Sequence, residues 1–225
     1  MRSRRRFDLV IFDLDGTLID NRVAIRDNFN WTLAAYGYQP LTDDAIDSMI
    51  GTPLIEMFQR TIPEKDGHLA PELVDVYRRR YHDTGDHGVV ILDDAISVLR
   101  YLRDSGLKLA VATTKEDNEA KFLVQKIGLS KHFDLITGLK QGFKNKPNPD
   151  MVRYVVTELG VDTDRTVFVG DTPIDIMTAR NAGIYAIAVT SSAPLGMTTL
   201  DKIRAANPDV IIDSLRDLPK YIYAN

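Results

Sequence analysis

Two pairs of aspartates follow apolar segments of the sequence. Asp13 and Asp15 come directly after Leu9–Phe12, in the string Phe-Asp-Leu-Asp-Gly-Thr-Leu. Asp171 and Asp175 lie in Gly-Asp-Thr-Pro-Ile-Asp, after a second apolar segment. Neighbouring carboxylates repel each other strongly unless a cation lies between them or one of them is protonated. A magnesium ion, which prefers oxygen ligands, and an acid–base role for one carboxylate would satisfy both conditions.

Each of these aspartates also has a purely structural alternative. Aspartate is common in turns after strands, and this would be a sufficient reason for Asp13 or Asp15 taken alone. Asp175 falls at the start of an expected helix, where an N-cap role and a metal-binding role are both open. The combination of the two pairs favours a metal site that includes Asp171 and Asp175.

One lysine and two threonines are placed to hold a phosphate group near these acids. Lys146 lies in Lys-Pro-Asn-Pro-Asp, where two prolines restrict the backbone just ahead of an expected helix. A carboxylate-rich site that binds a phosphate dianion needs a fixed positive charge besides the metal, and Lys146 is the best-placed supplier. Thr113 offers a hydroxyl, and the backbone N–H of Thr114 is available to a phosphate oxygen near the next helix.

The apolar pattern predicts an α/β fold. A short buried strand at 8–12 precedes the first acidic pair, and from residue 93 onward helix and strand signals alternate. The expected strands are 108–113, 133–137, 166–169, 184–189 and 210–212, and the expected helices are 93–105, 117–127, 149–159, 174–182 and 198–206. This alternation is typical of a doubly wound, Rossmann-like parallel sheet with helices on both faces. Ligands bind such sheets outside the carboxyl ends of the strands, which is where the candidate residues lie.

A helical insert separates the first strand from the others. Between about residues 18 and 89 the apolar residues recur at helical spacing, with a break at Gly51-Thr-Pro53. We therefore expect a catalytic core formed by residues 1–17 and 90–225, and a helical cap domain at 18–89. Trp31 is expected in the core of this insert. Arg22 and Arg26 are expected on its surface or facing an anionic substrate.

The composition excludes several classes of site and partner. With 44% of 225 residues hydrophobic, the chain can bury a large core. It contains no cysteine, which excludes disulfides, thiolate nucleophiles and thiolate metal sites. The apolar segment after the basic start is too short for a signal peptide or a membrane span, so we expect a cytoplasmic protein with no membrane partner. The net charge of −4 gives no broad basic surface, and no nucleic-acid partner is expected.

Taken together, the motifs resemble those of the haloacid dehalogenase superfamily, and within it the phosphoglycolate-phosphatase-like group. Four motifs match in order: Asp13-Leu-Asp-Gly-Thr17, the strand-end Thr113, Lys146-Pro-Asn-Pro149 and Gly170-Asp-Thr-Pro-Ile-Asp175. The resemblance spans residues 7–218. It implies that the insert is a helical cap of the first type, C1, which closes over the site and selects substrates.

The resemblance also implies a reaction and a role for each acid. Asp13 would attack phosphorus to form an aspartyl-phosphate, while Asp15 would protonate the leaving oxygen and then activate the hydrolytic water. Magnesium would be bound by the Asp13 carboxylate, the Asp15 backbone carbonyl and Asp171, with Asp175 in support.

The phosphoryl group would be held by Thr113 and Lys146. Related phosphatases often have Thr-Asn-Lys where this chain has Thr113-Thr-Lys115. This departure bears on the side-chain role of position 114 and leaves the reaction unchanged.

The resulting prediction is a magnesium-dependent phosphatase for a small phosphorylated metabolite, working as a monomer or homodimer. The presence of Asp15 counts against a dehalogenase, whose first motif lacks the second acid. A sugar phosphomutase would carry a histidine in the first cap helix and basic residues around the cap loop, where this chain has Ile25, Ile50 and Leu54. An inorganic pyrophosphatase and a non-catalytic binding module of the same fold are further alternatives, because the sequence does not identify the substrate.

Overall fold

The chain folds into two compact units. The computed structural model describes residues 6–84, 86–190 and 199–223. One unit, here called the core unit, comprises Met1–Asp20 and Ile91–Asn225. The other, called the insert unit, comprises Asn21–Val90. The candidate site residues all belong to the core unit.

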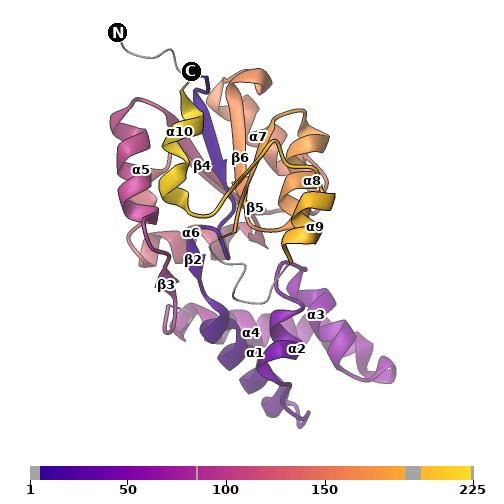
Figure 1. Cartoon of the computed structure of the whole chain (residues 1–225). Helices are drawn as coiled ribbons and strands as arrows, with labels where there is room; N and C mark the ends of the chain where they lie inside the picture. The colour runs from indigo at the N-terminus through magenta and orange to yellow at the C-terminus, as the bar shows by residue number, and fades with distance from the viewer. Residues whose placement is uncertain (1–5, 85, 191–198, 224–225) are drawn as a thin grey trace. The chain divides into compact units, whose positions relative to one another are not determined.

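A six-stranded parallel sheet forms the centre of the core unit (Figure 1). In spatial order its strands are β5 (Leu135–Leu139), β4 (Lys108–Glu116), β1 (Leu9–Phe12), β6 (Thr166–Gly170), β7 (Tyr185–Val189) and β8 (Val210–Ile212). Strand β1 is buried along its whole length and pairs in parallel with β4 on one side and β6 on the other. The predicted doubly wound α/β fold is therefore confirmed.

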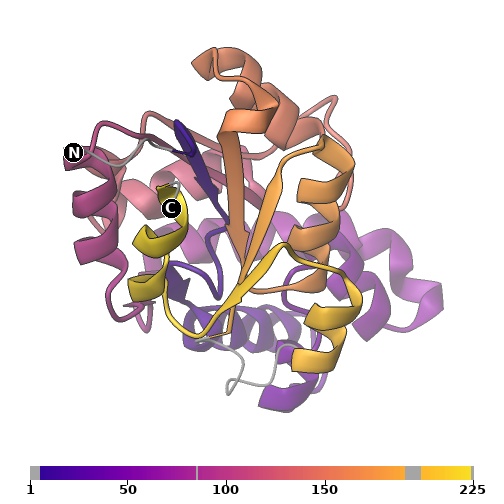
Figure 2. The ribbon, with the colours of Figure 1, turned by 45° about the horizontal axis from the view of Figure 1, so that its top comes forward.

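Helices cover both faces of this sheet (Figures 1 and 2). One face is covered by α7 (Asp150–Leu159), α8 (Pro173–Ala182) and α9 (Leu200–Ala205). The other carries α5 (Ala95–Asp104), α6 (Asp117–Lys126) and α10 (Pro219–Ile222). Short 3-10 turns lie at Ser130–His132, Thr163–Arg165 and Leu215–Asp217. The expected helix at 198–206 begins at a residue outside the described part of the chain.

Alternation along the strands divides the core between the two faces. Leu9 and Ile11 of β1 pack with Phe168 of β6 against the face that α7 and α8 cover, and all are fully buried. The intervening Val10 and Phe12 point to the other face, because successive side chains of a strand alternate. Buried on both faces, β1 is a rigid support for the residues that follow it.

Strand β4 is three residues longer than the sequence indicates. Its pairing with β5 shifts register between Ala112, which lies opposite Thr137, and Glu116, which lies opposite Leu139. Three residues of β4 thus face one residue of β5, which makes an irregular bulge. Hydrophobic periodicity does not detect this extension, because residues 113–116 are polar.

The described residues of the insert unit form four helices, namely α1 (Arg22–Ala35), α2 (Asp43–Asp47), α3 (Leu54–Thr61) and α4 (Ala70–Thr84), with a 3-10 turn at Glu64–Leu69. At its centre the rings of Phe29 and Phe58 stack with centroids 4.4 Å apart, and Tyr77 meets Phe58 edge-on at 6.3 Å. Pro53 directly precedes α3, as the break in the pattern predicts. Two short strands that the sequence did not reveal, β2 (Ile19–Asp20) and β3 (Val90–Ile91), pair where the chain leaves and re-enters the core unit.

The prediction that Trp31 lies in the core of the insert is wrong. Its side chain is 44% exposed, and the guanidinium of Arg80 lies 4.4 Å from its ring. Two residues along a helix correspond to a rotation of about 200°, so Trp31 lies almost opposite the buried Phe29.

The arginine Arg26 is held within the insert unit itself. Its guanidinium donates to both carboxylate oxygens of Asp47 and, at 2.9 Å, to Asp43. Asp47 is buried, so this bidentate pair is a structural link between α1 and α2.

We expect Phe58→Ala to lower the free energy of unfolding by about 3–5 kcal/mol, because it leaves a cavity beside Phe29 and Tyr77. Val23→Ala, on the same unit at a side chain that is 50% exposed, should change it by less than about 0.5 kcal/mol. Denaturant unfolding of the two variants and the parent protein measures both values. Equal effects would show that the aromatic cluster does not form the core of this unit.

Candidate active site

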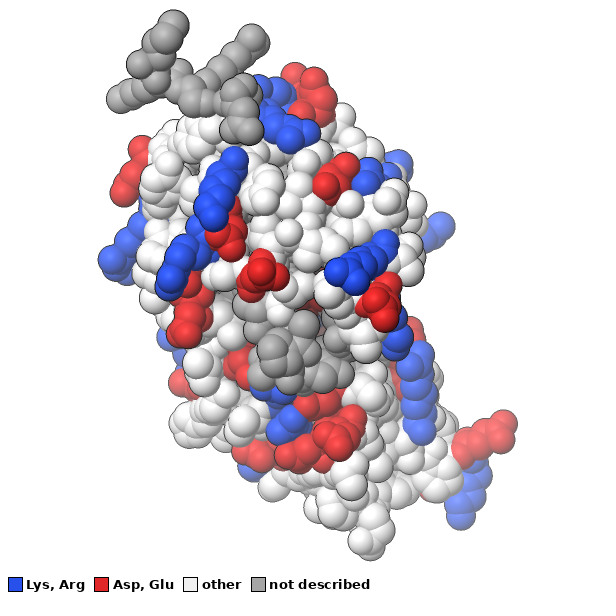
Figure 3. Space-filling model, viewed as in Figure 1, with Lys and Arg blue, Asp and Glu red and all other residues white. Residues whose placement is uncertain are grey.

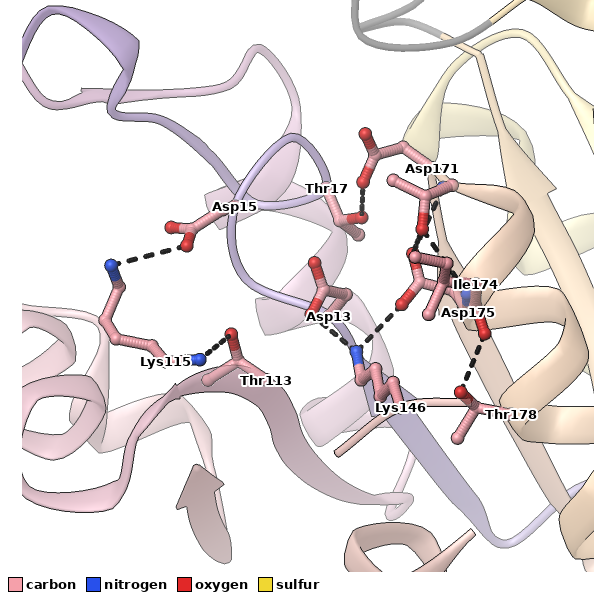
Figure 4. Close-up of polar contacts among 11 residues, drawn as sticks. Asp13, Asp15, Thr17, Thr113, Lys115, Lys146, Asp171, Ile174, Asp175 and Thr178 are labelled. Carbon is pink, nitrogen blue, oxygen red and sulfur yellow. Dashed lines mark hydrogen bonds and ion pairs between the residues drawn. The ribbon is translucent and has the colours of Figure 1, made fainter. Parts of the chain in front are cut away.

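Residues from four separate segments meet at the carboxyl edge of the sheet (Figure 4). Asp13 directly follows β1 and Asp171 directly follows β6, while Thr113 lies in β4 and Lys146 in the loop before α7. The Asp13 N–H donates to Val169 O at 2.9 Å, which continues the ladder between β1 and β6 beyond the last strand residue. The parallel order of β4, β1 and β6 is what brings these side chains together.

Lys146 is a buried cation between two carboxylates. Its Nζ donates to Asp13 Oδ1 at 2.7 Å and to Asp175 Oδ1 at 2.8 Å, and the residue is only 6% exposed. Burial alone would lower the pKa of Lys146, but the charges of Asp13 and Asp175 outweigh it and raise that pKa. The ammonium therefore stays charged and fixed in position.

The first turn of α8 fixes Asp175. Thr172 is the N-cap of this helix, and its hydroxyl accepts from the Asp175 N–H at 3.3 Å. In return, Asp175 Oδ2 accepts from the N–H and the hydroxyl of Thr172, at 3.1 and 2.6 Å. This is a capping box with proline at its first helical position, and the string Thr-Pro-Ile-Asp is a sequence signature for it. Asp175 thus supports the helix start and Lys146 at the same time.

Asp171 is held by the last two residues of the first motif, Gly16 and Thr17. Its Oδ1 accepts from the Thr17 hydroxyl at 2.8 Å, and both residues are buried. Gly16 has a φ of +84°, and a Cβ atom there would lie 2.3 Å from Asp171 Oδ2. Glycine is therefore required at this position both by backbone conformation and by the space that the carboxylate occupies. Thr17 was not among the predicted site residues, although it is the last residue of the first motif.

The buried carboxylates form a set suited to a divalent cation. Asp13, Asp171 and Asp175 each offer an oxygen, and these oxygens lie within 4.8 Å of one another. Three carboxylates with one ammonium leave excess negative charge in a buried place, which a cation with hard oxygen ligands would neutralise. The donor set therefore fits the metal that the sequence predicts.

The nucleophile candidate Asp13 has a strongly perturbed acidity in this setting. Burial raises the pKa of Asp13 from its ordinary value of 3.8 to about 7, and the charges of Asp175 and Asp15 add to this rise. The Lys146 ammonium opposes it. A bound cation would favour the ionised form further, as an added positive charge does.

The second acid of the first motif, Asp15, lies on the side of Asp13 away from Lys146 (Figure 4). Its Oδ2 is 3.4 Å from the Nζ of Lys115, and Oδ1 has no hydrogen-bond partner among the described residues. Lys115 was not among the predicted site residues. It stands two positions after Thr113, in the polar extension of β4.

The hydroxyl of Thr113 is fully buried and accepts from the Lys115 N–H at 3.3 Å. An accepting hydroxyl still has its own proton to donate, which suits contact with an anion. Thr114 follows it half-buried in the same bulge.

Comparison with known proteins places the chain in a family. Residues 10–189 match the model of the haloacid dehalogenase-like hydrolases, and the chain belongs to this family. It is 34% identical over 210 residues to the pyrophosphatase PpaX of Halalkalibacterium halodurans, covering 93% of this chain and 94% of that one. It is 31% identical over 233 residues to the phosphoglycolate phosphatase of Agrobacterium fabrum, covering 99% and 95%.

Solved structures agree with this placement. A haloacid dehalogenase-like hydrolase from Bacteroides fragilis superposes with a TM-score of 0.84 at 27% identity, covering 94% of this chain and 99% of that one.

Among the described residues, no helix has the length and apolar character needed to cross a membrane. On the face shown in Figure 3, basic and acidic side chains are interspersed.

We expect Thr17→Val to weaken divalent-cation binding about 10- to 100-fold, because the isosteric methyl cannot donate to Asp171 and outer-shell hydrogen bonds orient metal ligands. Thr17→Ser keeps the hydroxyl and should bind within about threefold of the parent protein. Calorimetric titration with Mg²⁺ or Mn²⁺ measures both. Unchanged affinity in the valine variant would show that this hydrogen bond does not orient a metal ligand.

Divalent-cation affinity should also depend on pH. Below about pH 7 the Asp13 carboxyl holds a proton that the cation must displace, so apparent affinity should fall about tenfold for each pH unit. Above pH 7 it should level off. Titrations in buffers of different ionisation enthalpy report the released proton directly, and an affinity that does not vary from about pH 5.5 to 8 would contradict this account.

Proposed function

We propose that this protein is a magnesium-dependent phosphatase that hydrolyses a small phosphorylated metabolite through an aspartyl-phosphate on Asp13. The observation that carries the proposal is the convergence of Asp13, Lys146 and Asp171 at one sheet edge, each oriented by a buried partner. Membership of the hydrolase family and the names of the relatives support it.

In this proposal the Asp13 carboxylate attacks phosphorus and the leaving oxygen departs on the opposite side. Asp13 is suited to this role because its backbone continues a fully buried strand and its Oδ1 is fixed by Lys146. An oriented carboxylate held in place before the reaction avoids the entropic cost of positioning it.

Charge on the transferring phosphoryl group is balanced by groups fixed before substrate binds. The Lys146 ammonium, the Thr113 hydroxyl and the Thr114 N–H are the proposed donors to its oxygens. Preorganised donors of this kind stabilise charge in a transition state more strongly than mobile ones. Lys146 is held by two carboxylates, so it contributes a fixed charge without competing for the nucleophile's second oxygen.

Magnesium would be held by the carboxylates of Asp13 and Asp171 and by the backbone carbonyl of Asp15, with Asp175 supporting through Lys146. When bound, it would neutralise phosphate charge and lower the repulsion between the dianion and the attacking carboxylate.

Asp15 is the proposed general acid and base. Asp15 Oδ1 is buried and has no hydrogen-bond partner among the described residues, and in this proposal it protonates the leaving oxygen and later accepts a proton from the hydrolytic water. A dehalogenase would have no need of this second acid.

The relatives differ in the bond that their names describe, one a pyrophosphate and the other a phosphomonoester. Our proposal covers a small phosphometabolite of either kind. A sugar phosphomutase is the alternative from the sequence, and stoichiometric release of inorganic phosphate would separate the two. A cytoplasmic location and a monomeric or homodimeric state stay predictions.

We expect Asp13→Asn to lose at least about 10³-fold of p-nitrophenyl phosphate hydrolysis, because an amide fills the same space but is not a nucleophile. Chelation should abolish turnover of the parent protein, and added Mg²⁺ should restore it. The matched control is Asp8→Asn, because Asp8 lies at the other end of β1 and its carboxylate pairs with Arg165, which has no part in the proposed reaction. Full activity in excess chelator, or near-normal turnover by Asp13→Asn, would contradict the proposal.

A further inference from the structure

The bulge in β4 fixes the position of the Lys115 backbone. The register shift leaves Thr113, Thr114 and Lys115 opposite Gly138 alone. A Cβ atom on Gly138 would lie 2.3 Å from the Lys115 carbonyl oxygen, so the two backbones are in close contact there. Bulges of this kind re-aim side chains and are common beside active sites.

The two acidic residues that follow Lys115 in the sequence, Glu116 and Asp117, accept hydrogen bonds from other parts of the chain. The Glu116 carboxylate caps α6 by accepting from the N–H groups of Asn118 and Glu119, at 2.9 and 3.1 Å. Asp117 accepts from the Gly138 N–H at 2.9 Å. The Lys115 ammonium instead lies toward Asp15.

The Lys115 side chain is mostly buried, with 9% of its surface exposed, and its Nζ is 3.4 Å from Asp15 Oδ2. Lys146 approaches Asp13 from another direction, and both of its carboxylate partners are also buried (Figure 4). The site therefore has two cations with different tasks. Lys146 pairs with the proposed nucleophile Asp13 and with Asp175. Lys115 lies beside Asp15, the proposed acid for the leaving group.

We propose that Lys115 determines specificity by binding a negative charge on the leaving group. This inference rests on the proposed function. A leaving oxygen protonated by Asp15 Oδ1 lies about 2.7 Å from that atom, and the Lys115 ammonium lies 3.4 Å from the other oxygen of the same carboxylate, so both groups flank one carboxyl group. An anionic group attached to the leaving oxygen, within one or two bonds of it, is then within direct reach of Lys115.

The two relatives named above act on substrates that share this chemistry. In phosphoglycolate the leaving group carries a carboxylate, and in pyrophosphate it carries the charged oxygens of a second phosphate. A single lysine beside the leaving oxygen recognises both without distinguishing carbon from phosphorus. The proposed substrate class is accordingly a phosphoryl compound whose leaving group bears its own negative charge.

The test compares substrates that differ in this charge. One pair is 2-phosphoglycolate and ethylene glycol monophosphate, and the other is pyrophosphate and methyl phosphate. We expect Lys115→Met to lower the ratio of kcat/KM for the anionic to the neutral member about 10- to 100-fold, the range for losing one charge-assisted hydrogen bond. Lys115→Arg keeps the charge and should retain most of the ratio, with some loss from its different shape.

Lys121→Met is the matched control. Like Lys115, Lys121 forms an ion pair with an aspartate, but its partner Asp117 has no part in the proposed reaction. Its ratio should stay within about twofold of the parent value. Lys115→Gln is measured in parallel, so the ratio is obtained even where the methionine variant does not fold.

The inference would be overturned if the ratio of kcat/KM for the anionic to the neutral substrate were the same in Lys115→Met, Lys115→Gln and the parent protein, whatever the absolute rates. That result would show that Lys115 only positions Asp15. That result would leave the phosphatase proposal intact, since phosphate would still be released. If the parent protein released phosphate from no substrate in the presence of Mg²⁺, the proposed function would fail and the inference would fail with it.

Discussion

The buried ammonium of Lys146 is the interaction on which the site depends. A charge removed from water is costly unless partners compensate for it, and here Asp13 and Asp175 do so at 2.7 and 2.8 Å. Those partners come from the end of β1 and the first turn of α8, which are adjacent only because β6 lies beside β1 in a parallel sheet. Loss of either carboxylate would leave the lysine under-compensated. The fold and the chemistry therefore share one electrostatic requirement.

Close approach between backbone and carboxylate is the second requirement. At Gly16 a Cβ atom would lie 2.3 Å from Asp171, and at Gly170 it would lie 2.4 Å from the Asp175 side chain. Both glycines are next to the aspartates of the two motifs, so their role is to leave room for the acids to converge. A buried cluster of acids cannot be spread apart to lower its repulsion, because the packing fixes the distances. Burial is the main cause of the raised Asp13 pKa, the charges of Asp175 and Asp15 add to it, and the same excess of negative charge favours a divalent cation.

Much of the fold could be predicted from sequence, because buried parallel strands such as β1 and β6 are continuous apolar segments. The convergence of Asp13, Lys146 and Asp171 follows from the rule that parallel strands present their carboxyl ends at one edge. What could not be predicted depends on contacts between distant segments. The extension of β4 is polar and is set by its register with β5, so Lys115 escaped notice. Trp31 was misplaced because an apolar residue in an amphipathic helix can still lie on the outer side.

In our proposal the two lysines of the site bind different parts of the substrate. Lys146 has both of its carboxylate partners buried, and in our proposal it holds the attacking carboxylate and the phosphoryl oxygens. In the proposed reaction the scissile bond would lie between that region and Asp15, which Lys115 approaches from β4. A phosphoryl group needs the first charge whatever it is attached to, whereas the second matters only when the departing group is itself anionic. In our proposal the charge that every phosphoryl group needs comes from Lys146, in the loop before α7, and the charge that distinguishes leaving groups comes from Lys115, in the bulge of β4.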